Sequence, residues 1–440
     1  MENFTILNNE WLPDICSILK RSFNVYRGIN IDVQYFWRLF ESDPGIRNGV
    51  MYGVIVDDHL ASFLQVVDRK LSMHPLSLRV AGIANVATDP DFRGRGHASK
   101  LLDNTLKDLA DKGYALASLF AGYGEPAHRI YRRYGFIDIV TYSNRVCIDE
   151  DLKLIEKQIN HYFSQIRSTF VNDYKEIKEA EQMENHIVLL KELYQREILE
   201  KYRASVVRDD ERWAGILKWN PFKTWFLSEI VKGSIIVDEE HAGYYIVHPV
   251  SKSILRKLMD PKTCFLSELV ASNKCSRLFL VKHFLERTMK TGCKTVIART
   301  TGKLDSIFEP CPRIGTNETF MVKIINYDGF YDFLSEFLDA NKHIMNHPIK
   351  RLIIHVNGKR SYSIIIGENI EIASKPPEKY DVLINETGLL RLLFSSSTAT
   401  REYRKDNIIV KNGLHGETLK FLDLLLRSRK SHYISLIDIW

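Results

Sequence analysis

The sequence contains no apolar run of 18 residues, and its first residues, Met-Glu-Asn-Phe-Thr, lack the basic start and apolar core of a signal peptide. It also lacks a basic stripe interleaved with aromatics, because a net charge of only +6 is spread over 440 residues. These absences predict a cytoplasmic protein that neither associates stably with a membrane nor binds nucleic acid. A hydrophobic content of 45% supports ordinary packed cores, and the length suits about three domains.

Closely spaced cysteine pairs are missing as well. The six cysteines stand far apart, at positions 16, 147, 264, 275, 293 and 311, with no CxxC and no paired histidine spacing. We therefore expect free, mostly buried thiols, with neither a metal site nor a framework of disulfides.

One stretch, residues 81–136, combines features that suit an anion. Residues 80–87 are mostly small or branched and apolar, which predicts a buried strand, and residues 101–112 place leucines on one face of a predicted helix that ends at Gly113. A strand, a turn and a helix in this order expose unpaired N–H groups and the positive end of the helix dipole. The turn adds glycines for close approach and arginines for charge, within Arg93, Gly94, Arg95, Gly96, His97 and Ala98.

The turn at residues 93–98 reads Arg-x-x-Gly-x-Ala, and one strand later residues 131–136 read Tyr-Arg-Arg-Tyr-Gly-Phe. Over residues 1–145 this order resembles the GNAT superfamily of acyl-CoA N-acyltransferases. The resemblance implies that the turn binds the pyrophosphate of coenzyme A, and that acetyl-CoA is the cosubstrate and no metal is used. It also implies that the acetyl carbonyl and pantetheine are held by the backbone of Val86, Ala87 and Thr88.

Tyr131 occupies the place of a tyrosine that lies near the thioester sulfur in this superfamily, and a phenol can protonate a departing thiolate. The alternative is that Tyr131 or Tyr134 only packs in the core. The base that deprotonates the amine is harder to assign, because the central strand carries Asn85 where many members have a glutamate. Glu125, in the predicted loop before Tyr131, is one substitute.

The middle of the chain repeats part of this pattern. A second hairpin, strand, helix and strand follow the order of the first, at residues 235–244, 266–273, 278–290 and 295–298. The phosphate-binding turn is lost, because residues 273–277 contain no glycine. We interpret residues 146–318 as a degenerate second GNAT-like domain that does not bind coenzyme A. Two unrelated α/β pieces are the alternative.

Residues 319–440 are predicted as strand, helix, hairpin, strand and helix, an order that resembles a sterol-carrier-like domain. Together with a catalytic domain over residues 1–145, the three-part order resembles the Eis (enhanced intracellular survival) group of acetyltransferases. The predicted fold class is α/β (α+β): tandem GNAT folds, each a mixed central sheet flanked by helices, followed by a sterol-carrier-like α+β domain. The group resemblance also implies a homo-oligomer, namely a hexamer.

In that group the terminal carboxylate enters the active site as the base, beside an aromatic last residue, and this chain ends in an apolar run and Trp440. A docked Trp440 is therefore one candidate base, alongside Glu125 and water. The loop over residues 121–129 looks longer than the group pattern and contains Pro126 and His128, which leaves the placement of Tyr131 open.

The sequence thus predicts an acetyl-CoA-dependent N-acetyltransferase that transfers the acetyl group directly to a primary amine of a small molecule. A polycationic amine, such as an aminoglycoside or polyamine, would suit the carboxylates near the predicted pocket walls, which are Glu41, Asp43 and Glu125. The family resemblance implies that the predicted helix with Phe36 and Trp37 forms part of the acceptor pocket. Ordinary core or surface roles are the alternative for each. Alternative functions are acyl transfer to a protein lysine or a biosynthetic intermediate, and acyl-CoA or lipid binding without catalysis.

Overall fold

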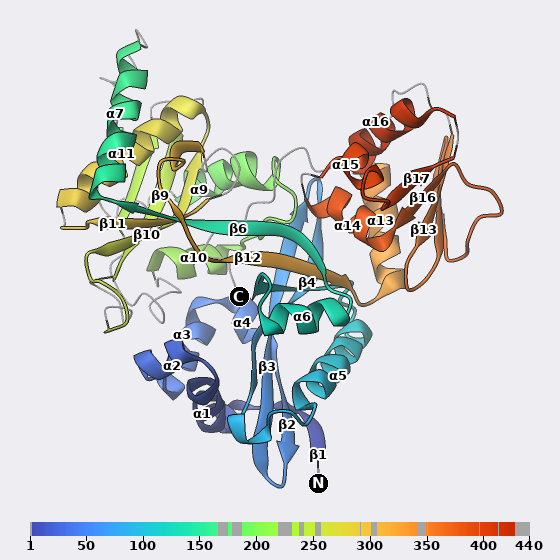
Figure 1. Cartoon of the computed structure of the whole chain (residues 1–440), viewed down its shortest axis with the longest axis horizontal. Helices are drawn as coiled ribbons and strands as arrows, with labels where there is room; N and C mark the ends of the chain where they lie inside the picture. The colour runs from blue at the N-terminus through green and yellow to red at the C-terminus, as the bar shows by residue number, and fades with distance from the viewer. Residues whose placement is uncertain are drawn as a thin grey trace.

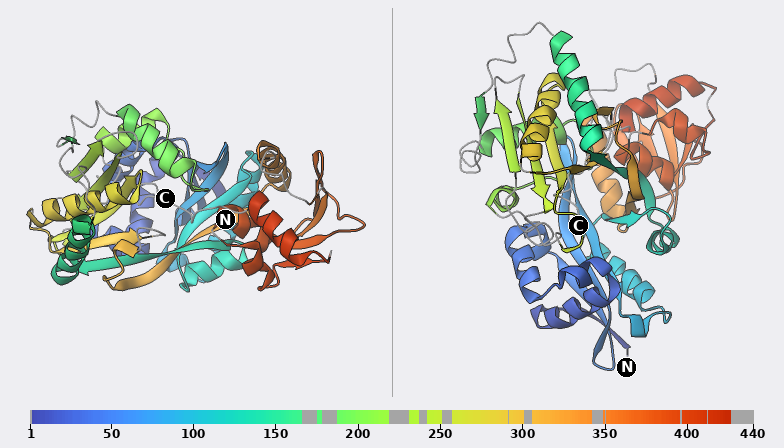
Figure 2. Two further views of the ribbon diagram at one scale, coloured as in Figure 1. Left: turned by 90° about the horizontal axis from the view of Figure 1, so that it is seen from above. Right: turned by 60° about the vertical axis from the view of Figure 1, so that its left-hand side comes forward.

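The computed structural model of the chain describes residues 2–165, 175–177, 187–218, 231–236, 242–250, 257–290, 292–300, 306–341, 349, 351–395, 397–411 and 413–426. Its elements form three lobes, made by the N-terminal, middle and C-terminal parts of the chain (Figure 1). A 12-stranded sheet runs through the first two lobes, and a 5-stranded sheet lies in the third. Figure 2 shows the same three lobes from two further directions.

The strands of the large sheet come from distant parts of the sequence. In spatial order they are β1 (Glu2–Leu7), β2 (Val50–Val56), β3 (His59–Met73), β4 (Leu76–Thr88), β5 (Leu116–Gly122), β12 (Arg313–Ile324), β6 (Ile137–Ile148), β11 (Thr295–Thr300), β10 (Thr263–Ala271), β9 (Ala242–Pro249), β8 (Val231–Ile236) and β7 (Lys175–Ile177). The smaller sheet has the order β15 (Ile370–Ala373), β14 (Tyr362–Ile366), β13 (Leu352–Asn357), β16 (Val382–Asn385) and β17 (Ile408–Val410).

Helices cover both sheets. Those of the first lobe are η1 (Asn9–Trp11), α1 (Leu12–Ser22), α2 (Asn24–Ile29), α3 (Val33–Ser42), α4 (Pro44–Arg47), η2 (Pro90–Phe92), α5 (His97–Asp111) and α6 (Pro126–Arg133). The rest are α7 (Asp149–Gln165), α9 (Ile187–Tyr194), η4 (Gln195–Leu199), α10 (Asp210–Lys218), α11 (Lys274–Lys290), α13 (Tyr327–Ala340), α14 (Glu386–Phe394), α15 (Ala399–Tyr403) and α16 (His415–Leu426).

The two halves of the large sheet repeat one order of strands. β2, β3 and β4 are antiparallel neighbours and β4 runs parallel to β5. In the same way β8, β9 and β10 are antiparallel and β10 runs parallel to β11. The strands that follow are exchanged, because β12 lies against β5 and β6 lies against β11. β6 and β12 also pair with each other, and they cross the molecule side by side in Figure 1.

The predicted boundaries at residues 145 and 318 fall inside the exchanged strands β6 and β12. The first two lobes therefore share one continuous sheet, and the division into three domains stays a prediction. The loop expected over residues 121–129 is short instead, because β5 ends at Gly122 and α6 begins at Pro126. Proline favours the first turn of a helix, where its missing N–H costs nothing.

Opposite faces of the first lobe's strands carry separate cores. The helices α1 and α3 cover one face, where Phe63 and Ala87 are buried. The helices α5 and α6 cover the other, where Leu64 and Ile83 are buried. Successive side chains of β3 and β4 alternate between these faces, as in any pleated strand.

A buried ion cluster fixes the first lobe against α10. The Asp43 carboxylate lies 2.7 Å from Nη2 of Arg69 and 2.9 Å from Nη1 of Arg212, and all three side chains are 3–4% exposed. Burial alone would raise the pKa of Asp43, but the guanidinium groups of Arg212 and Arg69 hold this pKa well below its usual range. The helices approach closely here, because a Cβ at Gly215 would lie 2.3 Å from the carbonyl oxygen of Ser42.

The third lobe places its helices against one face of the smaller sheet. The side chain of Asn385 caps α14 by accepting a hydrogen bond from the backbone N–H of Gly388. Arg391 on this helix reaches β6, since its Nε donates to the carbonyl oxygen of Asp138 at 3.2 Å. The sterol-carrier-like character of this lobe stays a prediction.

The structure corrects the expectation of free thiols. Cys147 pairs with Cys311, and Cys264 pairs with Cys293, as disulfides. The first joins the end of β6 to the segment before β12, across a sequence separation of 164 residues. Cys16 and Cys275 are free.

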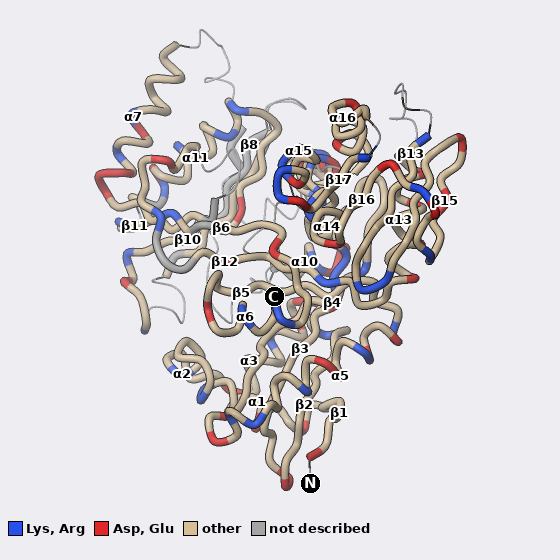
Figure 3. The backbone as a smooth tube through the Cα atoms, turned by 45° about the vertical axis from the view of Figure 1, so that its right-hand side comes forward, with Lys and Arg blue, Asp and Glu red and all other residues tan. Residues whose placement is uncertain are grey.

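Basic and acidic positions are interspersed along the backbone of all three lobes (Figure 3). Among the helices of the described residues, none is long and apolar enough to cross a membrane.

The substitution Asp43→Ala is expected to lower the free energy of unfolding by roughly 3–5 kcal/mol, because it removes the carboxylate that Arg69 and Arg212 share in a buried site. Denaturant unfolding measures this loss. As the matched control, Glu211→Ala removes an exposed ion pair with Arg47 and should cost less than about 1 kcal/mol. Equal losses in the two variants would contradict the assignment.

Candidate functional site

β4 and β5 are neighbours for only part of their length. Their parallel pairing ends at Ile83 and Leu119, although β4 continues to Thr88 and β5 to Gly122. Beyond that point β4 stays paired with β3, and β5 stays paired with β12. The two strand ends therefore diverge, which leaves a gap in the sheet at the carboxyl ends of two parallel strands.

A bulge in β4 lies where the divergence begins. Two steps along β3, from Phe63 to Gln65, oppose three steps along β4, from Ala84 to Ala87, so β4 carries one extra residue. Asn85 within the bulge has a φ of 52°, in the left-handed region. The predicted carbonyl-binding residues follow directly on the diverging end of β4: Val86, Ala87 and Thr88.

The side chain of Asn85 is held at both ends. Its Oδ1 accepts a hydrogen bond from the Tyr26 hydroxyl at 2.7 Å, and its Nδ2 donates to Oε1 of Gln65 at 2.8 Å. Burial raises the pKa of Tyr26 to about 12, so this phenol stays protonated at neutral pH. Together these contacts attach α2 and β3 to the bulge.

The turn before α5 is open to solvent. Gly94 and Gly96 have φ of 77° and 83°, and a Cβ at either would meet no atom within 4 Å. No side chain caps the start of α5, and Arg93 and Arg95 are exposed beside it. Uncapped N–H groups at a helix start attract an anion, and the two guanidinium groups add positive charge.

His97 and Ala98, the other residues predicted for this turn, begin α5. Nδ1 of the buried His97 lies 3.0 Å from Oε1 of Glu2, and Nζ of Lys100 donates to Oε2 of Glu2 at 2.6 Å. The hydrogen bonds from Lys100 and then His97 lower the pKa of Glu2. These contacts tie the start of α5 to β1 and fix the turn against the sheet.

Tyr131 lies on α6, in the core that also holds α5. Its side chain is buried, and burial raises its pKa to about 12. Its hydroxyl has no hydrogen-bond partner within the described ranges of the chain. The Tyr134 hydroxyl instead donates to the carbonyl oxygen of Ser99 at 3.0 Å, so Tyr134 joins α6 to α5. Tyr131 is thus the tyrosine of this helix whose proton is available to a ligand.

His128 is not available as a base, because both ring nitrogens are engaged. The backbone N–H of Gly124 donates to Nδ1 at 3.2 Å, and Nε2 donates to Oδ1 of Asp138 at 2.8 Å. Glu125 precedes α6 and is exposed. Trp440 lies outside the residues that the structure describes.

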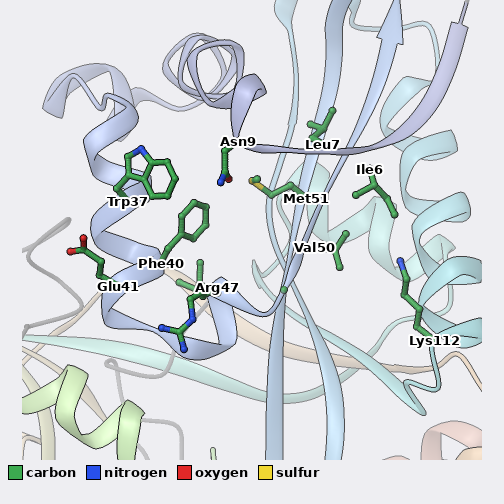
Figure 4. Close-up of a pocket in the computed structure, with 12 residues that line it drawn as sticks. Ile6, Leu7, Asn9, Trp37, Phe40, Glu41, Arg47, Val50, Met51 and Lys112 are labelled. Atoms are coloured by element: carbon green, nitrogen blue, oxygen red, sulfur yellow. The ribbon is translucent and has the colours of Figure 1, made fainter.

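A pocket of about 610 Å³ lies between α3, α4, the end of β1 and the start of β2 (Figure 4). Trp37 and Glu41, both predicted to bind the acceptor, line this pocket together with Phe40 and Met51. Phe36, by contrast, is fully buried in the core and does not line it. Asp43 does not line this pocket either, because its carboxylate is engaged by two guanidinium groups in the interior.

The pocket is level with the β4 bulge along the sheet. Met51 pairs in register with Gln65, and Gln65 pairs in register with Ala84. Sequence reasoning missed Gln65 and Tyr26. The available signal for Gln65 was a lone amide inside the apolar run of residues 63–67, whereas nothing local indicated the partner of Tyr26. Within the described residues, no group of three or more His, Cys, Asp or Glu side chains could hold a metal ion.

Residues 5–137 match the family model of the GNAT acetyltransferase domain. Solved structures similar to this chain include a probable N-acyltransferase of unknown function from Enterococcus faecalis (TM-score 0.67, 14% identity) and a GCN5-related N-acetyltransferase from Anabaena variabilis (TM-score 0.66, 14% identity). Eis1 from Mycobacterium abscessus is also similar (TM-score 0.64, 13% identity). Each likeness covers 100% of both chains. Comparison with curated proteins gives no match.

At these identities the solved structures establish the fold over the whole length, while the family model covers the lobe that contains the divergent strands, the open turn and Tyr131. The predicted α/β (α+β) fold class is thereby confirmed, while the sterol-carrier-like character of the third lobe stays a prediction. Residues 5–137 form a GNAT acetyltransferase domain, and the protein that carries it is an acyltransferase.

Proposed function

We propose that this protein transfers an acetyl group from acetyl-CoA directly to a primary amine of a small molecule. The divergence of β4 and β5 next to the uncapped start of α5 carries this proposal. A GNAT domain uses an acyl-CoA, and the open turn fits its diphosphate. Gly94 and Gly96 leave room for close approach, and Arg93 and Arg95 supply countercharge.

When bound, acetyl-CoA supplies the thioester. The backbone of residues 86–88 on the diverging end of β4 orients its carbonyl, because N–H groups outside the strand ladder can donate to a developing oxyanion. Tyr131 holds a proton at Oη that can pass to the departing thiolate. A phenol with a pKa of about 12 remains protonated across the physiological range.

The pocket offers the Glu41 carboxylate to an amine acceptor, while Arg47 and Lys112, which also line it, are paired with Glu211 and Asp108. The rings of Trp37 and Phe40 meet edge to face at 5.8 Å, which presents an aromatic surface to a cation beside the Glu41 carboxylate. We therefore retain a polycationic amine, such as a polyamine or aminoglycoside, as the acceptor class.

Acetyl-CoA consumption with amines of rising charge tests this function. Transfer should rise with amine charge, and Tyr131→Phe should lower kcat tenfold or more, a usual effect of losing a general acid. The control is Tyr114→Phe, which removes the hydroxyl of another buried tyrosine whose pKa is about 12, one that hydrogen-bonds Arg79 instead. Full activity of Tyr131→Phe would exclude it as the proton donor.

The phosphate-binding turn has a closely matched control. Gly96→Asp places a carboxylate beside the start of α5 and should raise the KM for acetyl-CoA at least tenfold, through repulsion of the diphosphate. Gly113→Asp introduces the same charge after the opposite end of α5, at a φ of 81° with equally open space, and should leave the KM within about twofold. An equal KM in the two variants would place the diphosphate elsewhere.

The base is proposed to be the Trp440 carboxylate, with Glu125 or water as the alternatives. Extending the chain by a Gly-Ser dipeptide after Trp440 moves this carboxylate and should lower kcat at least tenfold without changing the thermal unfolding midpoint. Glu125→Gln provides the comparison. If only Glu125→Gln is impaired, Glu125 is the base; if neither variant is, the base is water.

A further inference from the structure

A buried amide group beside the β4 bulge lacks a partner. Gln65 is 2% exposed, and its Oε1 accepts a hydrogen bond from Nδ2 of Asn85. Its Nε2, however, has no hydrogen-bond partner among the described residues. A buried donor left unsatisfied destabilises the folded protein, and most such groups in proteins are paired. The position of this exception, at the start of the strand divergence, suggests that a ligand supplies the partner.

The orientation of the amide is fixed by its neighbours. The Tyr26 hydroxyl donates to Oδ1 of Asn85, so Nδ2 of Asn85 points to Gln65 and leaves Nε2 of Gln65 as the free end of the chain of hydrogen bonds. Each donor in such a chain polarises the next, which strengthens the final donor. Gln65 can therefore offer a hydrogen bond to an oxygen.

The Gln65 side chain lies on the face of the sheet opposite to Tyr131, and this is the face from which the amine can approach. Tyr131 belongs to the core with α5, together with the neighbouring Leu64 and Val66. The Gln65 side chain alternates to the opposite face, where Tyr26 and α3 lie. A thiolate protonated by Tyr131 leaves from one face, and an amine that attacks the same carbonyl has the other face for its approach.

One flexible side chain, Met51, separates the pocket of Figure 4 from this amide. Met51 lines the pocket and is paired directly with Gln65, and paired residues of antiparallel strands point to the same face. Methionine has several rotatable bonds and adapts to its neighbours. Adjacent strands lie about 4.8 Å apart, so Gln65 stands about one strand from the bulge and one strand from the pocket wall.

We infer that Gln65 is a specificity-determining residue that donates a hydrogen bond from Nε2 to an oxygen of the acceptor. The preferred acceptor then carries a hydroxyl or ether oxygen separated from its reactive amine by two or three carbon atoms, because Gln65 is adjacent to the bulge. An amine without that oxygen leaves the amide unpaired and is disfavoured. This inference rests on the proposed acetyl transfer to an amine and names the class of acceptor.

The test compares pairs of amines that differ by exchange of a hydroxyl for a methyl group: ethanolamine with propylamine, and aminopropanol with butylamine. The wild-type kcat/KM should favour the hydroxyl-bearing amine of at least one pair tenfold or more. Gln65→Met keeps the side-chain length without the amide and should reduce this preference to about twofold or less. Comparing the same pair in both proteins cancels the difference in amine basicity.

Two further variants control the result. Gln34→Met makes the same exchange at an exposed position on α3 and should keep the wild-type preference. Gln65→Glu retains an oxygen for Asn85 but removes the donor, so it should lose the preference as well, and it serves if Gln65→Met does not fold. An unchanged preference in the folded Gln65 variant, or a wild type that favours the methyl analogues, would overturn the role of Gln65 alone. Absence of transfer to every amine would overturn the proposed function and this inference with it.

Discussion

The site depends on where β5 finds its hydrogen-bond partners. After Leu119 it pairs only with β12, while β4 remains with β3, so two parallel strands separate inside an otherwise continuous sheet. Without β12 the end of β5 would have free N–H and C=O groups on both sides, and nothing would hold it away from β4. The gap proposed to admit the thioester is thus maintained by residues 313–324, far from the GNAT match in the sequence.

The exchange of β6 and β12 also explains how the first two lobes are joined. β12 follows the strands of the middle lobe in sequence but pairs with β5 of the first, and β6 follows the strands of the first but pairs with β11 of the middle lobe. The disulfide Cys147–Cys311 and the pairing of β6 with β12 hold these two exchanged strands together. The buried cluster of Asp43, Arg69 and Arg212 adds a second connection, on the side of α3 and α4. The wall that carries Trp37 and Glu41 is therefore positioned by the middle lobe as well as by its own.

Local pattern was enough to predict the strand–turn–helix at residues 80–112 and the second hairpin, because apolar periodicity and glycine placement are set by near neighbours. The strand exchange, the bulge at Asn85 and the disulfides depend on partners far along the chain, so no spacing revealed them. Asp43 is a further example, because its position in the sequence suggested a pocket wall, whereas its partners Arg69 and Arg212 are distant in sequence and make it the centre of a buried ion cluster. Gln65 was visible only as an unexplained polar residue in an apolar strand.

The late position of β12 has a consequence for synthesis on the ribosome. About 200 residues separate the end of β5 from the end of β12, so at 5–20 residues per second β5 waits about 10–40 s for its partner. β6 emerges earlier but runs parallel to β5, because both are antiparallel to β12, and it cannot take that place without reversing. During this interval the nascent first lobe presents a bare strand edge, and a chaperone bound there would protect it from pairing with another chain.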